Sequence, residues 1–313
     1  MNFIKYIKEK GMKHALEIIW KYKIDKVIQK IILLFVKNKP LKNIIVIESH
    51  NDFDNNGGAF YDYLIKNNYN DKYLIIWLLK NKLKRELPKN VKAYPIFSPS
   101  IRKNYYICVA KYFTSDCEVV GKIRNGQESY YLSHGTFSLK NSSGKIDIPE
   151  KVDYILIPSK FTEEIQKNQY RPKKGTKMIS LGFPIHDKIL QDCNSQLNKI
   201  INENKYKKKI IWMPTFRKGG GFRRNDSNIE FPLGIPLITN QEEYVELDNL
   251  LQKENILLII KFHPMQDEDT IKIKESNNIK LITNDVMKKY NIDTYELIKE
   301  TDALISDYSS IAY

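Results

Sequence analysis

Several side chains suited to phosphate chemistry stand directly after apolar, β-branched runs in this sequence. Arg217 follows one such run, and a guanidinium can bind a phosphate through two parallel hydrogen bonds. Lys261 and His263 follow another run and alternate with Phe262, so at a strand end both would lie on one face. That face would offer a phosphate one fixed and one switchable cation. The alternative is a solvated Lys261 and a His263 that caps the next turn.

Two further signatures carry a candidate base and a pair of hydroxyls. His134 stands next to Gly135, which permits a close backbone approach, and its imidazole can accept a proton from an attacking hydroxyl. Ser309 and Ser310 offer two hydroxyls and backbone N–H groups at an expected helix start, an arrangement that suits a phosphate. The alternatives are a structural turn at His134 and simple N-capping by the serines.

Other common chemistries find no support in the sequence. No GxxxxGK[ST], HExxH or GxSxG motif is present, which argues against P-loop, zincin and α/β-hydrolase sites. Cys108, Cys117 and Cys193 form neither a CxxC pair nor a Cys/His cluster. We interpret the cysteines as packing residues in a reducing compartment.

From residue 41 onward, short apolar runs alternate with amphipathic stretches, which is typical of parallel sheets covered by helices. The runs predict strands at 44–48, 73–79, 106–110, 130–132, 154–157, 178–181, 210–213, 256–260, 279–282 and 303–305. Helices are predicted at 59–66, 161–169 and 294–301. The polar stretch 186–209 is the best candidate for a junction between domains at 41–188 and 189–313. Because ligands bind at the carboxyl ends of strands in such sheets, the polar signatures are expected to converge on one site.

Residues 1–40 form a separate basic segment with ten lysines and three acids. Apolar residues recur at helical spacing, and most lysines lie off that stripe, which predicts an amphipathic helix. The stripe consists of Ile24, Val27, Ile28, Ile31 and Phe35. Such a helix can lie in the headgroup plane of an anionic membrane, or it can simply pack on its own domain.

The overall charge favours a polyanionic partner without choosing one. Fifty-one Lys plus Arg against 37 Asp plus Glu give a formal net charge of +14. No RNP-like, zinc-finger or helix-turn-helix signature is present, so we do not expect nucleic-acid binding. The amino terminus lacks the features of a signal peptide, and the apolar run Ile31 to Val36 is too short to span a bilayer. The predicted location is the cytoplasm, peripheral to the inner face of the cell membrane.

Taken together and in order, the signatures resemble the CDP-glycerol glycerophosphotransferase family, which builds teichoic acids and some capsules. The resemblance covers roughly residues 44–313. Its motifs are Glu48-Ser49, Asp54-Asn55 with Ala59 to Leu64, Tyr112 to Asp116, His134-Gly135-Thr136 with Leu139-Lys140, Pro158-Ser159, Gly182-Phe183-Pro184 with Asp187, Pro214-Thr215-Phe216-Arg217, His263-Pro264 and Ser306-Asp307-Tyr308-Ser309-Ser310.

The resemblance implies a GT-B architecture, with two Rossmann-like domains, the active site in the cleft between them, and attachment to the membrane surface. It also implies that His134 is the base and that His263 takes part in catalysis. We expect the donor phosphates to be bound by Thr215, Arg217, Lys261, Ser309 and Ser310. The residues expected on the acceptor side are Gly135, Thr136, Asp54 and Asn55. The resemblance further implies that no bound metal is needed, and no cofactor is expected.

The predicted reaction moves a polyol phosphate, most simply glycerol phosphate, from a CDP-activated donor to a lipid-linked polyol-phosphate or glycan acceptor. One alternative is a GT-B glycosyltransferase or epimerase that uses a nucleotide sugar. Another is an inactive, truncated, membrane-associated member of the family. Since family members continue beyond the Asp-Tyr-Ser-Ser motif, the resemblance implies that the second domain is incomplete in this sequence.

Overall fold

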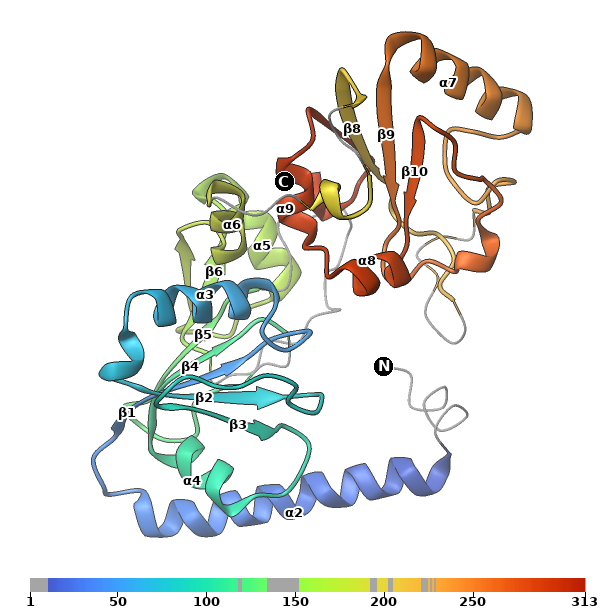
Figure 1. The fold of residues 1–313 in the computed structure, drawn as a ribbon. Coiled ribbons are helices and arrows are strands. Elements are labelled where there is room, and N and C mark those ends of the chain that lie inside the picture. Colours follow the sequence, from blue (N-terminus) through green and yellow to red (C-terminus); the bar gives the residue numbers. More distant parts are fainter. Residues whose placement is uncertain are drawn as a thin grey trace. The chain divides into compact units, whose positions relative to one another are not determined.

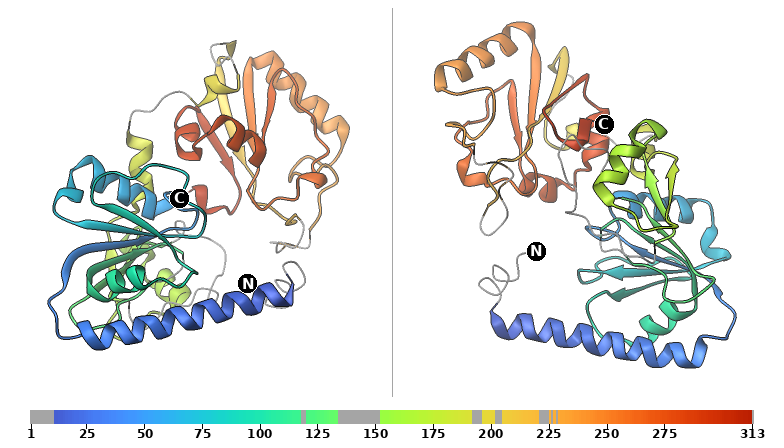
Figure 2. Two further views of the ribbon diagram at one scale, coloured as in Figure 1. Left: turned by 60° about the horizontal axis from the view of Figure 1, so that its bottom comes forward. Right: turned by 180° about the vertical axis from the view of Figure 1, so that it is seen from behind.

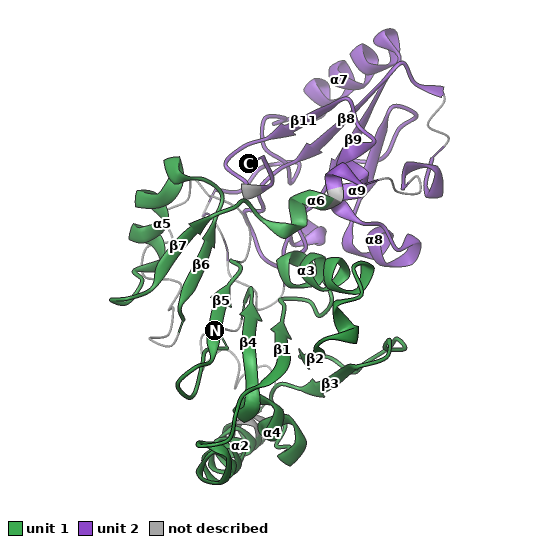
Figure 3. Cartoon of the chain, turned by 90° about the vertical axis from the view of Figure 1, so that its left-hand side faces the viewer, with its two compact units in different colours: residues 1–137, 141–187 green, residues 138–140, 188–313 purple. Residues whose placement is uncertain are grey.

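The computed structural model describes residues 11–117, 120–133, 152–191, 196–201, 205–220, 225, 227 and 229–312. The chain divides into two compact units, shown in different colours in Figure 3. Unit 1 contains residues 1–137 and 141–187, and unit 2 contains residues 138–140 and 188–313.

Unit 1 is built on a seven-stranded parallel sheet with the order β3-β2-β1-β4-β5-β6-β7. The strands are β1 (Lys42–Glu48), β2 (Leu74–Leu79), β3 (Val91–Pro95), β4 (Ala110–Ser115), β5 (Glu128–Tyr131), β6 (Tyr154–Ile157) and β7 (Lys177–Ser180). The helices are α2 (Met12–Val36), α3 (Asn55–Lys66), α4 (Ile101–Val109) and α5 (Glu163–Tyr170). A short helix, α6 (Asp187–Leu190), begins at the last residue of unit 1 and continues into unit 2. The strand order reverses between β1 and β4, and ligands of doubly wound sheets bind at such a switch point.

Both faces of this sheet are apolar because its central strands are covered from both sides. Alternate residues of β1 divide between two cores: Ile45 and Ile47 pack under α3, whereas Ile44 and Val46 pack on the side of α2 and α4. Figure 1 shows α3 above the sheet and the α2–α4 pair below it.

Unit 2 is a four-stranded parallel sheet with the order β10-β9-β8-β11. Its strands are β8 (Lys208–Met213), β9 (Ile256–Lys261), β10 (Ile279–Ile282) and β11 (Ala303–Ser306), and its helices are α7 (Gln241–Glu254), α8 (Asn284–Tyr290) and α9 (Thr294–Lys299). Alternate residues of β9 again face two separate cores, which is the pattern of a strand buried on both sides. The two units confirm the predicted α/β, GT-B-like fold class.

One predicted strand is wrong. Residues 106–110 form the end of α4 and the first residue of β4, and the strand itself runs from Ala110 to Ser115. Ser100 caps α4 by accepting a hydrogen bond from the Lys103 N–H at 3.2 Å, and Ile107 and Cys108 pack in the same core as residues of α2. A short apolar run fits a buried helix as well as a strand, and here the cap and the partner helix favour the helix.

The amino-terminal helix is present, but its predicted apolar stripe is divided. Ile24 and Ile28 are partly buried, whereas Val27, Ile31 and Phe35 are more than half exposed. A buried polar contact fixes the helix to α4: Asp25 pairs with Lys103 at 2.7 Å and accepts the Ser100 N–H at 3.1 Å. Figure 2 shows the helix running along unit 1 and continuing past α4. Among the described residues, no helix has the length and hydrophobicity that a membrane span requires.

Candidate functional site

A buried carboxylate organises the carboxyl edge of the unit 1 sheet. Asp116 follows β4 and has no solvent exposure. Its two oxygens accept hydrogen bonds from Ser49 Oγ at 3.0 Å, the His50 N–H at 2.8 Å and the Gly57 N–H at 2.8 Å. Burial, together with the nearby charge of Glu48, raises the pKa of Asp116 to about 7 although these hydrogen bonds oppose the change. Asp116 therefore ties the end of β4 to the loop after β1 and to the first turn of α3.

A second buried acid, Glu48, lies beside it at the end of β1. Lys80, which follows β2, pairs with Glu48 at 2.8 Å. Burial by itself would lower the pKa of Lys80, but its contact with Glu48 outweighs this and raises the pKa. His50 Nδ1 contacts Cys117 Sγ at 3.1 Å. The motifs that carry the family resemblance include Glu48 and Asp116, but the sequence did not reveal that both are buried at one edge.

The predicted acceptor-side residues Asp54 and Asn55 lie at the start of α3. Asp54 is the N-cap and accepts the Asn55 N–H at 2.7 Å. The backbone around this cap is strained, because Asp52 and Phe53 in the loop and Asn55 at the first position of α3 all have φ values between 54° and 56° without being glycine. Such strain is concentrated at functional loops of proteins, so this loop is a reasonable place for a ligand contact.

The predicted base, His134, and its neighbours Gly135 and Thr136 lie outside the described residues. The residue before them, Ser133, is described and is held firmly. It adopts a left-handed conformation with φ 66°, its hydroxyl bonds the Tyr170 hydroxyl, and its carbonyl accepts a hydrogen bond from Asn56 Nδ2 at 3.0 Å. The backbone that leads into His134 is therefore fixed by two separate helices of unit 1.

In unit 2, an ion pair and hydrogen bonds join the residues that follow β8 to those that follow β11. Arg217 Nη2 pairs with Asp307 Oδ2 at 2.8 Å, and the Thr215 N–H donates to Asp307 Oδ1 at 3.2 Å. Arg217 Nη1 also donates to the Tyr308 hydroxyl, and its guanidinium lies 4.7 Å from the centre of that ring. Burial raises the pKa of Asp307, but hydrogen bonds from Thr215 and Arg217 outweigh it and hold the pKa below its usual range.

The signature after β9 adds two bases to the same edge. The His263 ring stacks on Phe216, with the ring centres 4.6 Å apart, so the segments after β8 and β9 are in contact. His263 Nδ1 accepts the Met265 N–H at 3.1 Å, so a neutral His263 carries its ring proton on Nε2. Lys261 ends β9 with 5% of its surface exposed, and burial lowers its pKa to about 8 although Asp293 opposes this change.

The serines of the last signature are less completely defined. Ser309 follows β11 and is partly buried, and its carbonyl accepts the Ala312 N–H at 3.3 Å. The backbone of Ser310 begins a short 3-10 helix, Ser310–Ala312, but its side chain is outside what the structure describes. The backbone of Ser309 and Ser310 thus lies beyond the carboxyl end of β11, but the positions of the two hydroxyls are not both described.

Comparison with known proteins identifies the family. The sequence model of the CDP-glycerol:poly(glycerophosphate) glycerophosphotransferase family matches residues 31–313. The chain belongs to this family. It is therefore a transferase of the CDP-glycerol glycerophosphotransferase kind, and the family resemblance seen in the motifs is confirmed.

Individual relatives agree with this assignment, and solved structures share the fold. The chain is 25% identical to a teichoic acid poly(glycerol phosphate) polymerase of Bacillus spizizenii, over 93% of this chain and 75% of the relative. A teichoic acid glycerol-phosphate primase of Bacillus subtilis is also 25% identical, over 51% of this chain and 36% of the primase. The solved structure of the wall teichoic acid polymerase TagF matches with a TM-score of 0.63 at 19% identity, over 99% of this chain and 76% of that one.

For this glycerophosphotransferase family member, each sheet edge offers a different kind of chemistry. The unit 2 edge gathers Thr215, Arg217, Lys261 and His263 with backbone N–H groups, and cations and N–H donors of this kind suit phosphate oxygens. The unit 1 edge instead gathers buried acids and a rigid backbone next to His134. Within the described residues, no group of three or more His, Cys, Asp or Glu side chains could hold a metal ion.

Proposed function

We propose that the chain transfers glycerol phosphate from CDP-glycerol to a lipid-linked acceptor at the membrane surface, as part of teichoic acid synthesis. The family match over residues 31–313 carries this proposal. It is supported by the relatives, which are polymerases and primases of teichoic acid, and by a solved TagF variant that was soaked with CDPG. The arrangement of unit 2 is consistent with a donor that carries two phosphates.

In the proposed mechanism, His134 accepts the proton of an acceptor hydroxyl. The oxygen of that hydroxyl attacks the glycerol-side phosphorus of the donor. The bond from that phosphorus to the bridging oxygen breaks, and CMP leaves with the electron pair. Lys261, Ser309 and Ser310 would bind the phosphates, and the Nε2–H of His263 would donate to one of them. These groups offset the charge that builds up on the leaving phosphate.

The sequence predicts that Arg217 binds a donor phosphate, but in the structure its guanidinium already has other partners. Its guanidinium already contacts Asp307, Tyr308 and the Thr215 carbonyl, the last at 3.2 Å. Those contacts hold the guanidinium of Arg217 in one orientation, so a phosphate would bind to N–H groups that are already positioned. We therefore propose that Arg217 both braces the loops after β8 and β11 and binds a donor phosphate.

We further propose that α2 is the part of unit 1 that docks on an anionic membrane. One stripe of the helix faces away from α4, and each of its apolar side chains is at least half exposed. The stripe consists of Leu16, Trp20, Val27, Ile31 and Leu34. The exposed lysines of the same helix include Lys23, Lys26 and Lys30. Apolar side chains bordered by lysines match the boundary between acyl chains and anionic headgroups.

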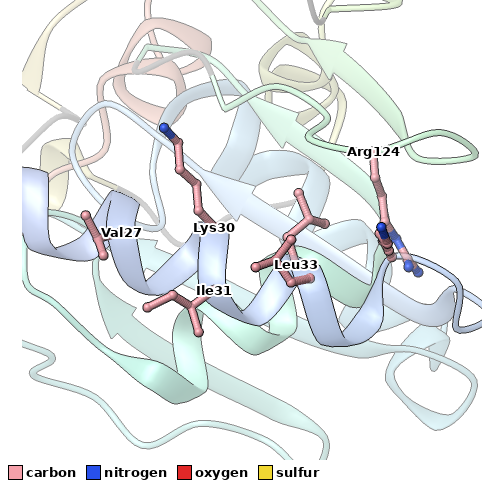
Figure 4. A pocket seen from close by; sticks show the side chains of 7 residues that line it. Val27, Lys30, Ile31, Leu33 and Arg124 are labelled. Atoms are coloured by element: carbon pink, nitrogen blue, oxygen red, sulfur yellow. The ribbon is translucent and has the colours of Figure 1, made fainter.

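An open groove of about 440 Å³ lies along this stripe. In Figure 4 the lining side chains Val27, Lys30, Ile31 and Leu33 follow one another along α2, and Arg124 lies beyond Leu33. Val27, Ile31 and Leu34 line it together with the side chains of Lys30 and Lys37, and its surface is almost entirely apolar. The groove therefore adds apolar surface to the stripe, in agreement with the membrane proposal.

Release of CMP tests the proposed reaction. The protein is incubated with a lipid-linked acceptor analogue and with CDP-glycerol, CDP-ribitol or a UDP-sugar, and the released nucleotide is separated by chromatography. CMP released from CDP-glycerol, with a loss of about 10²–10⁴-fold in the His134→Ala variant, is the expected result. Turnover of the UDP-sugar alone would replace the proposal with nucleotide-sugar chemistry. Full activity of His134→Ala would remove the assigned base.

Sedimentation with vesicles tests the docking of α2. The protein is expected to bind phosphatidylglycerol vesicles and to bind phosphatidylcholine vesicles much less. Val27→Glu should weaken this binding, because it places a carboxylate in the apolar stripe. Val245→Glu makes the same change at an exposed position of α7 and serves as the matched control. Equal binding by both variants would show that another surface meets the membrane.

A further inference from the structure

Asn56 has an unusual position in unit 1, because it is a buried amide that joins three separate segments. It is the second residue of α3 and is 1% exposed. Its Nδ2 donates to the carbonyls of Leu132 and Ser133, each at 3.0 Å, and its Oδ1 accepts the Ile185 N–H at 3.1 Å. The amide therefore connects α3 with the residues that follow β5 and with the short 3-10 helix Pro184–His186 that follows β7.

The two carbonyls that Asn56 binds belong to the residues directly before His134. Ser133 has a φ of 66°, a left-handed conformation that a residue with a side chain adopts only when its surroundings impose it. Asn56 binds its carbonyl and Tyr170 binds its hydroxyl, so α3 and α5 together impose that conformation. Ser133 is the last described residue before the predicted base, His134.

Only asparagine supplies this set of contacts at this position. Its primary amide has two N–H groups on one nitrogen for the two carbonyls, and an oxygen for the Ile185 N–H. Aspartate has the same shape but no N–H, so it would place an oxygen against two carbonyl oxygens. Glutamine carries the same amide one methylene further from the backbone, and the site is fully buried.

We infer that Asn56 is a positioning residue for the transfer reaction, which sets the placement of His134 through the backbone of Leu132 and Ser133. This inference rests on the proposed function, since it takes His134 to be the base. Asn56 does not itself touch the reacting groups in this role. Its contribution is to hold the base in the geometry that proton transfer requires, where a displacement of about 1 Å can lower the rate about 10²-fold.

The decisive test is a double-mutant cycle with CDP-glycerol turnover as the readout. Asn56→Asp is expected to lower kcat about 10²-fold and to leave the KM for CDP-glycerol within about twofold, because donor contacts lie in unit 2. In a His134→Ala background the same substitution should have no further effect, because a misplaced base cannot matter once the base is absent. A loss of rate that persists in that background would overturn the inference.

Asn278→Asp is the matched control. Asn278 is also buried, and its Nδ2 also donates to two backbone carbonyls, those of Leu251 at 3.3 Å and Ile256 at 2.7 Å. The same chemical change in unit 2, at the start of β10, is expected to lower thermal stability while kcat stays within about twofold. If Asn278→Asp reduced kcat as much as Asn56→Asp does, the effect of Asn56 would be one of general stability.

Tyr170→Phe keeps the inference testable if Asn56→Asp does not fold. It removes the hydroxyl that contacts Ser133 Oγ and keeps the ring, which packs edge-on against Tyr131. We expect a loss of several-fold in kcat, an unchanged KM and, again, no further effect in the His134→Ala background. A normal kcat in Tyr170→Phe, with Asn56→Asp unfolded, would count against the inference. An unchanged rate in His134→Ala alone would remove the assigned base and with it this inference, whereas a wild type that releases no CMP from CDP-glycerol would remove the proposed function.

Discussion

Replacing Lys261 with methionine tests two effects of its buried ammonium. We expect the ammonium to bind a phosphate of the donor and to lower the stability of the folded protein. The side chain ends β9 on the same sheet face as Leu257 and Ile259, both of which are fully buried in a core with Leu297. Methionine has a similar length and no charge, so it should fill the same space. The substitution therefore removes the charge with little change in packing.

The pKa gives the size of the expected effect. Burial lowers the pKa of Lys261 from 10.5 to about 8. At about 1.4 kcal/mol for each tenfold change in the equilibrium, keeping this ammonium charged costs about 3 kcal/mol more in the folded protein than in the unfolded chain. Because the nearby Asp293 loses a favourable charge in the variant, we expect Lys261→Met to raise the free energy of unfolding by roughly 1–3 kcal/mol at pH 7.

The pH dependence of this difference has a definite sign. Between pH 8 and 10.5 the folded protein has released the Lys261 proton while the unfolded chain still binds it, so the wild type gains stability as the pH rises. The unfavourable contribution is complete below pH 8 and disappears toward pH 10.5. The advantage of Lys261→Met should therefore be largest at pH 7 and smaller at pH 9.5, as measured by urea denaturation.

The same variant should bind the donor more weakly. Loss of a charged hydrogen bond to a phosphate should lower the affinity for CDP-glycerol about 10- to 100-fold. Calorimetry at pH 7 measures this affinity. Lys280→Met, on the neighbouring strand β10 and paired with Glu275 at 3.2 Å, is the matched control and should leave donor binding unchanged. A Lys261→Met protein that is less stable than the wild type and binds the donor normally would refute the reasoning. Lys261 would then be a structural partner of Asp293.

Three further outcomes follow from unit 1. Asp25→Asn should lower the free energy of unfolding by roughly 3 kcal/mol in urea denaturation, because it leaves the buried Lys103 ammonium without its carboxylate; an unchanged midpoint would mean that α2 is held by apolar contacts alone. Gly58→Ala should lower it by about 1–3 kcal/mol, because a Cβ at this position would lie 2.5 Å from the Phe53 carbonyl; wild-type stability would show that the loop shifts freely. The pKa of Asp116 is about 7 in the folded protein against 3.8 ordinarily, so stability should fall as the pH rises from about 4 to 7 and level off above it. Thermal melts of Asp116→Asn should lack that decline, and a decline of equal size would assign it to other groups.

Much of the architecture was determined by local sequence pattern. The alternation of apolar runs with amphipathic stretches was sufficient to predict two parallel α/β units, because a strand buried on both faces needs a nearly continuous apolar run. The polar signatures at 214–217, 261–264 and 306–310 were correctly placed at strand ends, since a change from apolar to polar residues marks the strand end directly. Their order along the chain was enough to indicate the family. Residues 106–110 were predicted wrongly, because five apolar or aromatic residues fit a helix and a strand equally well.

Only the tertiary structure decided which side chains bond to which. Arg217 and Asp307 are 90 residues apart, and Asn56 and Ser133 are 77 apart, so no local pattern could pair them. The sequence also could not predict that Lys261 is buried, or that the α2 stripe divides into a packed part and an exposed part. Burial depends on which element covers a residue, and strand register and helix packing fix that over the whole chain. The sequence therefore determines which chemical groups stand at the sheet edges, and the fold determines their partners, their charge and their direction.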